Sequence, residues 1–138
     1  MDDKKITSFI KQLSKDTLDN KIYWKRLTDY QGIKPASNKP IFNMLFETEF
    51  RHIDFSTSYY AIVNNGEIYL LNELTISGRS GTINSGYKVY LHSEASDKVS
   101  YLSCDAALVF QLINSIHSYL ASEEADAESF IDDFLSKN

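Results

Sequence analysis

The chain has 138 residues, of which 43% are hydrophobic and 24% charged, so it can form one domain with its own core. Its formal net charge of −5 argues against nucleic acid as the default partner. A single cysteine, Cys104, excludes an intramolecular disulfide, and no run approaches the roughly 18 apolar residues of a membrane span, so we expect a cytoplasmic protein without membrane contact.

The first 55 residues predict one helix and then become harder to interpret. Residues 3–18 place apolar side chains at steps of three and four, which indicates an amphipathic helix. Residues 21–30 suit a short strand or a continuing helix, and their alternation favours the strand. Residues 31–40 contain both prolines and predict a loop. Residues 41–55 suit either a strand or a helix, and both interpretations stay open.

A β-hairpin is predicted next, around Asn64-Asn65-Gly66-Glu67. Tyrosines and β-branched residues before and after this turn favour a pleated surface. The Asn-Gly pair is typical of a tight hairpin turn because it tolerates positive φ angles. In the second strand the alternation places Ile68 and Leu70 on one face, and Tyr69 and Leu71 on the other.

The segment ISGRSGTINSGY, residues 76–87, is the only glycine-rich stretch. Gly81 and Gly86 have the spacing of a Walker-type phosphate loop, but Tyr87 stands where that loop needs lysine. The residues after Gly86, YKVYLHSE, alternate like a strand, so no helix N-terminus is available to hold a phosphate. We therefore predict a hairpin loop over residues 77–86, in which Arg79 is the residue most able to reach a partner's anion.

The C-terminal third predicts a strand at residues 99–104 and then a long apolar helix capped by Asp105. The last segment, residues 123–138, is acidic and amphipathic, with Phe130, Ile131, Phe134 and Leu135 among the acids. Packing of this segment against the domain is the first interpretation. Docking into another protein's groove and disorder are the alternatives.

Catalytic and metal-binding signatures are weak throughout. His52, His92 and His117 form no ligand-spaced pair, and Cys104 has no second cysteine beside it. No Gly-x-Ser-x-Gly motif is present. We therefore predict a protein without cofactor or metal that is not an enzyme, although a site assembled from dispersed residues stays an alternative.

Tyrosine is abundant, with nine residues, and most fall on predicted strands. A tyrosine-bearing sheet face can stack nucleic-acid bases, but it would need more basic residues nearby than this chain offers. Core packing and a protein interface are therefore favoured, and Tyr69 and Tyr90 are predicted partner contacts.

The chain as a whole resembles small uncharacterised α+β proteins of low-GC Gram-positive bacteria and their mobile elements. The resemblance rests on the amphipathic helix with Trp24 after it, the SYYAIVNNGEIYLL hairpin, SGYKVYLH and the closing apolar helix. It implies no activity and assigns no functional residue.

These observations predict a single α+β domain over residues 1–138. It should have an N-terminal helix, a mostly antiparallel sheet of about five strands and a long C-terminal helix on one sheet face. We expect a non-enzymatic protein-binding or regulatory module, a homodimer or an inhibitor encoded by a phage or mobile element. A nucleic-acid-associated protein or acidic DNA mimic is the alternative.

Overall fold

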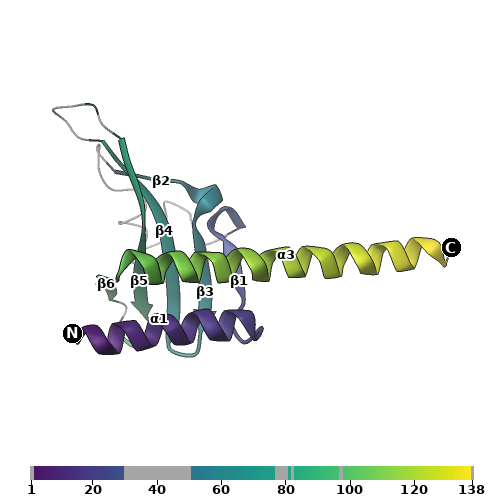
Figure 1. Ribbon diagram of the computed structural model, residues 1–138, viewed down its shortest axis with the longest axis horizontal. Helices are drawn as coiled ribbons and strands as arrows, with labels where there is room; N and C mark the ends of the chain where they lie inside the picture. The colour runs from purple at the N-terminus through teal and green to yellow at the C-terminus, as the bar shows by residue number, and fades with distance from the viewer. Residues whose placement is uncertain (1, 30–50, 77–80, 82, 97, 138) are drawn as a thin grey trace.

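The computed structural model describes residues 2–29, 51–76, 81, 83–96 and 98–137. Two helices, α1 and α3, lie side by side across one face of an antiparallel sheet, and both cross its strands (Figure 1). The predicted α+β architecture is confirmed, with α1 as a second helix on the face that α3 covers.

The sheet has the strand order β1-β3-β4-β5-β6. These strands are β1 (Trp24–Arg26), β3 (Tyr59–Val63), β4 (Gly66–Ile76), β5 (Ile83–Ser93) and β6 (Val99–Leu102). A sixth strand, β2 (Arg51–Ile53), pairs with the far end of β4. Residues 41–55 were consistent with either a strand or a helix, and β2 shows that the described end of this segment contains a strand. The predicted loop at 31–40 and residues 41–50 lie outside the described residues.

Both hairpins are present. In the β3–β4 turn Gly66 has a φ of 150°, and a Cβ there would stand 2.0 Å from the carbonyl oxygen of His92 on β5, so only glycine fits. The tight turn is confirmed, but because Val63 pairs with Gly66 its two residues are Asn64 and Asn65, and the positive φ angle belongs to Gly66 and not to Asn65. In the second hairpin Ile76 pairs with Ile83, which confirms that the glycine-rich segment joins two antiparallel strands. Its connection, residues 77–82, is shorter than predicted.

Helix α1 (Asp3–Leu18) is capped at its N-terminus by Asp2, whose carboxylate accepts a hydrogen bond from the backbone N–H of Lys4. Its buried stripe faces the sheet, as the sequence predicts: Ile6, Ile10, Leu13, Thr17. The Thr17 hydroxyl accepts a bond of 2.8 Å from the indole N–H of Trp24 on β1. This bond, with both side chains buried, fixes the end of α1 to the edge of the sheet.

Helix α3 (Ala106–Ser136) is capped by Asp105, whose Oδ1 accepts a bond of 2.9 Å from the N–H of Ala107. Its buried residues all belong to the first half: Val109, Leu112, Ile113, Ser115, Ile116 and Tyr119. With α1 and the near face of the sheet they form the main core.

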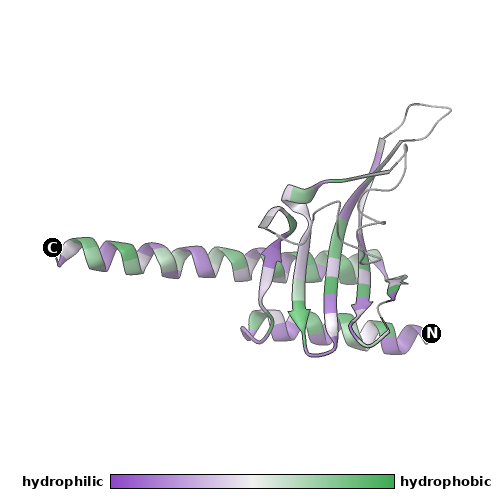
Figure 2. Ribbon diagram, turned by 180° about the vertical axis from the view of Figure 1, so that it is seen from behind, coloured by the Kyte–Doolittle hydropathy of each residue, from purple (hydrophilic) through white to green (hydrophobic). Residues whose placement is uncertain are grey.

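The far face of the sheet, which Figure 2 turns toward the viewer, carries a second, smaller cluster of buried side chains. It consists of Leu27, Tyr60, Tyr69, Leu71 and Tyr90, each buried. Tyr60 and Tyr69 lie on paired strands, and their rings stack with centroids 6.3 Å apart. The sheet therefore has an apolar cluster on each side.

Candidate interaction surface

Helix α3 is about twice as long as the sheet is wide. At 1.5 Å per residue its 31 residues span about 46 Å. Five strands spaced about 4.8 Å apart place the outer two only about 19 Å from each other. The first 15 residues, 106–120, therefore suffice to cross the sheet. The remainder of the helix, residues 121–136, extends past β1 into solvent, and we call it, together with the capping residue Lys137, the arm (Figure 1).

The apolar residues of the arm repeat the buried positions of the first half. Eighteen residues make five helical turns at 3.6 residues per turn, so residues i and i+18 face the same direction. Phe130, Ile131 and Phe134 thus correspond to Leu112, Ile113 and Ile116, all of which are buried against the sheet. The face of α3 that covers the sheet continues along the arm.

On the arm this face is exposed. Phe130 is 73% exposed and Ile131 54%, against 0% and 6% for their counterparts Leu112 and Ile113. Phe134 and Leu135 are exposed as well. The interpretation that residues 123–138 pack against the domain is therefore wrong for the described residues, because the sheet ends before the helix does.

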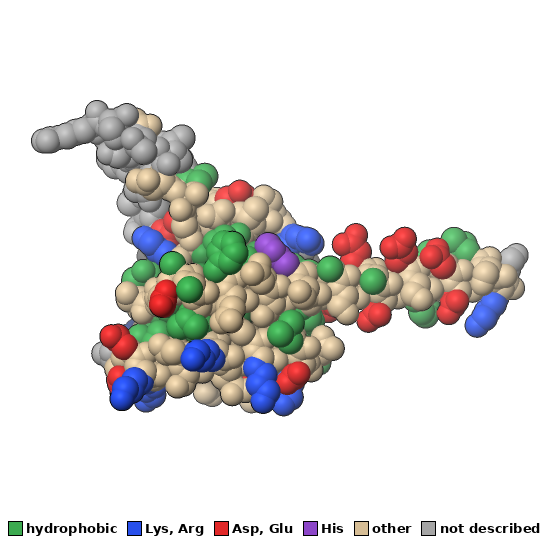
Figure 3. Space-filling model, viewed as in Figure 1, with side chains coloured by type: hydrophobic (Ala, Val, Ile, Leu, Met, Phe, Trp, Pro, Cys, Tyr) green, Lys and Arg blue, Asp and Glu red, His purple; other side chains and the backbone are tan. Residues whose placement is uncertain are grey.

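Acidic side chains surround the apolar residues of the arm, and one of them, Glu123, lies nearly two full turns before Phe130 on the same face. The arm carries six of them, with Lys137 as its only base: Glu123, Glu124, Asp126, Glu128, Asp132, Asp133. The net charge of the arm, −5, equals that of the whole chain, so residues 1–120 carry no net charge. Figure 3 shows the contrast between acids along the arm and lysines over α1. The arm is therefore an acidic amphipathic helix attached to a neutral body.

The junction between the two halves has a hydrogen bond of its own. The hydroxyl of Tyr119, which is buried, donates to Oε1 of Glu123 at 2.6 Å. Burial first, and then this carboxylate, raise the pKa of Tyr119 well above its ordinary value. This side-chain bond spans one helical turn where α3 leaves the sheet, which favours a helix that continues without a break.

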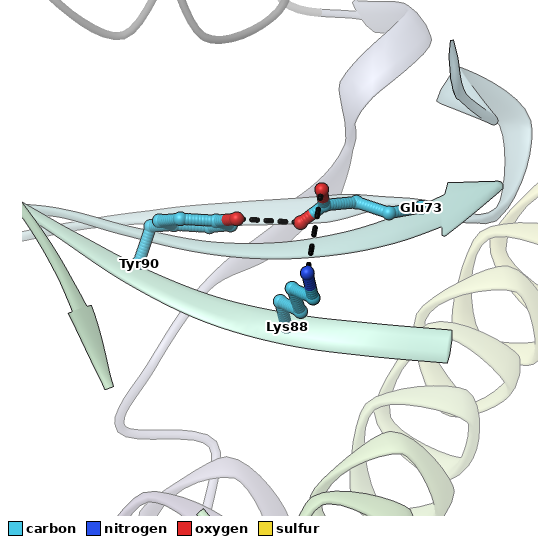
Figure 4. A network of polar contacts seen from close by, with 3 residues as sticks. All are labelled: Glu73, Lys88 and Tyr90. Carbon is cyan, nitrogen blue, oxygen red and sulfur yellow. Dashed lines mark hydrogen bonds and ion pairs between the residues drawn. The ribbon is translucent and has the colours of Figure 1, made fainter. Parts of the chain in front are cut away.

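The structure places Tyr69 and Tyr90, two predicted partner contacts, in the second cluster. They are 0% and 5% exposed, so a partner cannot reach them in this arrangement. Tyr90 donates to Glu73 at 2.5 Å, and the Nζ of Lys88 lies 4.0 Å from the same carboxylate (Figure 4). Tyr69 donates to Glu67. Each phenol hydroxyl therefore donates a hydrogen bond to a carboxylate beside the cluster, which explains why tyrosine and not a wholly apolar residue occupies these positions.

The remaining candidate residues are dispersed. Arg79 lies outside the described residues. His117 forms a bond of 3.0 Å with the hydroxyl of Tyr59. Burial raises the pKa of the Cys104 thiol, which opposes formation of a reactive thiolate, and the thiol donates to the Leu102 carbonyl at 3.4 Å. Among the described residues no three His, Cys, Asp or Glu side chains are grouped to hold a metal ion.

Two adjoining pockets lie between α1 and the sheet, and both are lined by Phe9 and Leu91. The smaller, about 200 Å³, is otherwise lined by Lys5, Ile6 and Leu102. The larger, about 300 Å³, is lined by residues of the β3–β4 turn and of β5 and β6: Val63, Asn65, Gly66, Glu67, Ile68, His92, Ser93, Ser100. We call the two together the Phe9–Leu91 groove.

Glu67 and His92, which are directly paired on β4 and β5, also contribute to the lining of the larger pocket. The imidazole of His92, 5% exposed, has its Nδ1 3.8 Å from the carboxylate of Glu67. Because these two residues alternate with Ile68 and Leu91, their side chains lie on the face of Tyr69 and Tyr90, whereas Phe9, Val63 and Ile68 pack in the main core on the α1 face.

Sequence reasoning found the apolar residues of the arm but missed that the arm continues the preceding helix. Two signals were available. Residues 106–136 contain neither glycine nor proline, so nothing in them ends a helix. The 18-residue repeat also joins the two apolar runs into one helical face.

A comparison of the chain with protein-family models, curated proteins and solved structures finds no match. The resemblance to proteins of Gram-positive bacteria therefore stays a prediction. In the described part of the chain, no helix is long and apolar enough to cross a membrane.

Proposed function

We propose that this protein is a non-enzymatic protein-binding module in which the arm of α3 is the recognition element. The observation that carries the proposal is the 18-residue repeat, which continues a core-forming face onto an exposed helix. The body holds the first half of α3 on the sheet and so presents the arm as a preformed helix. The free thiol of Cys104 supports a reducing, cytoplasmic setting.

An amphipathic helix that lays its apolar face into a groove is a recurring mode of protein recognition. Its anchors lie three, four and seven positions apart, and the anchors of the arm, Phe130, Ile131 and Phe134, lie within one turn of each other. Large aromatic anchors carry much of the binding energy in such interfaces. The arm needs no helix nucleation because α3 already supplies it, and this lowers the ordering cost of binding.

The charge of the arm favours a protein over a nucleic acid as partner. Six carboxylates along the arm repel a phosphate backbone, and the body has no net charge to offset them. A protein groove with basic or polar borders accommodates both the apolar face and the acids beside it.

The experiment compares the full chain with a chain ending at Ala127, which keeps Glu123 as the partner of Tyr119, by thermal unfolding and by light scattering at several concentrations. The proposal predicts that truncation leaves the melting temperature of the monomer unchanged, because the apolar residues that it removes are exposed. Any self-association of the full chain should disappear with the arm. A truncated monomer that melts clearly earlier would place the arm in the fold of its own body and overturn the proposal.

A further inference from the structure

We propose that the occupant of the Phe9–Leu91 groove is the arm of a second copy of this chain, so that copies assemble head to tail. The inference rests on the proposed function, since it names the partner of the arm. It is carried by three features of the described residues, which are the position, the charge and the shape of the two surfaces.

Position makes the contact intermolecular. Leu91 and Leu102 line the groove from β5 and β6, at the edge of the sheet opposite β1. The arm leaves the body beyond β1 and points away from that edge (Figure 1). An arm that extends straight from the body cannot reach the groove of its own chain, whereas it can reach the groove of another.

Charge selects arm-to-body contact over arm-to-arm contact. Two arms side by side would bring net charges of −5 and −5 together, and this repulsion opposes an antiparallel helix pair. An arm on a body meets a surface without net charge, and the groove has Lys5 in its lining. Glu67 also belongs to the groove lining, but its carboxylate accepts a hydrogen bond from Tyr69, a residue of the second cluster on the far face of the sheet.

Shape matches the spacing of the anchors. Phe130 and Phe134 are four residues apart, which places their Cβ atoms about 6 Å from each other on one helix face. The groove offers two adjoining pockets, of about 300 and about 200 Å³, with Phe9 and Leu91 common to both. One phenyl ring can enter each pocket while Ile131 lies over the shared wall.

A head-to-tail contact leaves one groove and one arm available at the two ends of every open assembly. Such heterologous contacts form rings or open chains and do not stop at a dimer. The average mass of the full chain should therefore rise beyond that of a dimer as its concentration increases.

The test is a disulfide cross-link between two differently labelled chains, both with Cys104→Ser. One carries Leu135→Cys beside the arm's apolar face, and the other carries Ser100→Cys in the groove lining. A disulfide requires Cα atoms within about 7 Å, so it forms only if arm and groove meet. The expected result is a mixed dimer in several-fold excess over two control pairs, in which Ser129→Cys replaces the arm cysteine or Ser8→Cys the groove cysteine.

A charge reversal at the groove supplies a second readout without cysteines. Lys5→Glu adds a carboxylate where the acidic arm binds, and several-fold weaker association is expected from light scattering. Lys11→Glu makes the same change at an exposed lysine of α1 that lines neither pocket, and it should weaken association less.

The outcomes separate the two proposals. A full chain that stays monomeric at every concentration, or cross-links as strong in the controls as in the test pair, overturns head-to-tail assembly. If truncation after Ala127 still leaves the melting temperature unchanged, the arm keeps its role as a recognition element for a different protein. If truncation lowers the melting temperature, both proposals fall.

Discussion

Residues 106–120 of α3 and the arm beyond them belong to one helix, and Ile113 and Ile131 mark the same angular position in each half. Ile113 is 6% exposed against the sheet, whereas Ile131 is 54% exposed. The difference comes from the width of the sheet, because both halves carry the apolar pattern that covers a surface. An apolar helical face thus indicates that the face can pack against another surface. The width of the sheet decides whether that surface belongs to the same chain.

The difference in burial between the two halves is tested by making the same substitution in each of them. Ile113→Ala should lower the free energy of unfolding by about 2–5 kcal/mol, the usual cost of truncating a buried isoleucine. Ile131→Ala should change it by less than about 0.5 kcal/mol at concentrations where the chain is monomeric. Helix propensity cancels between the two variants, so urea unfolding followed by circular dichroism isolates burial. Equal losses would contradict the distinction.

A smaller loss is expected where α1 supports the first half of α3. Thr17→Val keeps the shape of the side chain but leaves the indole N–H of Trp24 buried without its 2.8 Å acceptor. An unsatisfied buried donor costs about 1–3 kcal/mol. Thr7→Val makes the same change at a half-buried position of the same helix and serves as the control in chemical denaturation. A control that loses as much stability would show that the Thr17–Trp24 bond is not the cause.

The start of α3 and its arm can be compared through two aspartates. Asp105→Ala removes the cap of the helix and should cost about 0.5–2 kcal/mol of stability. Asp132→Ala lies on the arm and should leave monomer stability within about 0.5 kcal/mol, while changing the charge by the same amount. Thermal unfolding of both variants checks this, and a larger effect at Asp132 would contradict the account.

The smallest expected effect lies at the junction of the two halves. The folded chain raises the pKa of Tyr119, so above about pH 10 the unfolded chain loses a proton that the folded chain keeps. Stability should therefore fall as pH rises through this range, and Tyr119→Phe should make the fall shallower. Glu123→Gln removes the carboxylate beside Tyr119 but not the burial of its ring, so it should change the slope less than Tyr119→Phe does. Denaturation at several alkaline pH values measures both, and an unchanged slope for Tyr119→Phe would contradict the assignment.

The sequence predicted the fold better than the candidate site, and the reason is physical. The spacing of Ile6, Ile10 and Leu13 and the alternation around Tyr69 report which side of an element is buried, and these local patterns were sufficient for α1 and the hairpins. They do not report what the buried side faces. The same alternation therefore suggested that Tyr69 and Tyr90 were partner contacts, although each lies under its neighbours and donates to a carboxylate.

The arm illustrates the converse. Phe130 and Ile131 have the spacing of core residues, and packing against the domain was the natural interpretation. Only the number of strands and the direction in which α3 crosses them reveal that the sheet ends some 15 residues before the helix. Both are tertiary properties that no local window of sequence contains.

Hydrogen exchange along α3, in a dilution series of the full chain, tests the central claim most directly. Residues 106–120 should exchange slowly at every concentration, because these amides lie in the half that covers the sheet. Residues 121–136 should exchange rapidly in dilute solution, and slower exchange on concentration would indicate assembly with a second copy. Slow exchange of the arm in dilute solution, equal to that of the first half, would contradict the claim that it is an exposed recognition helix.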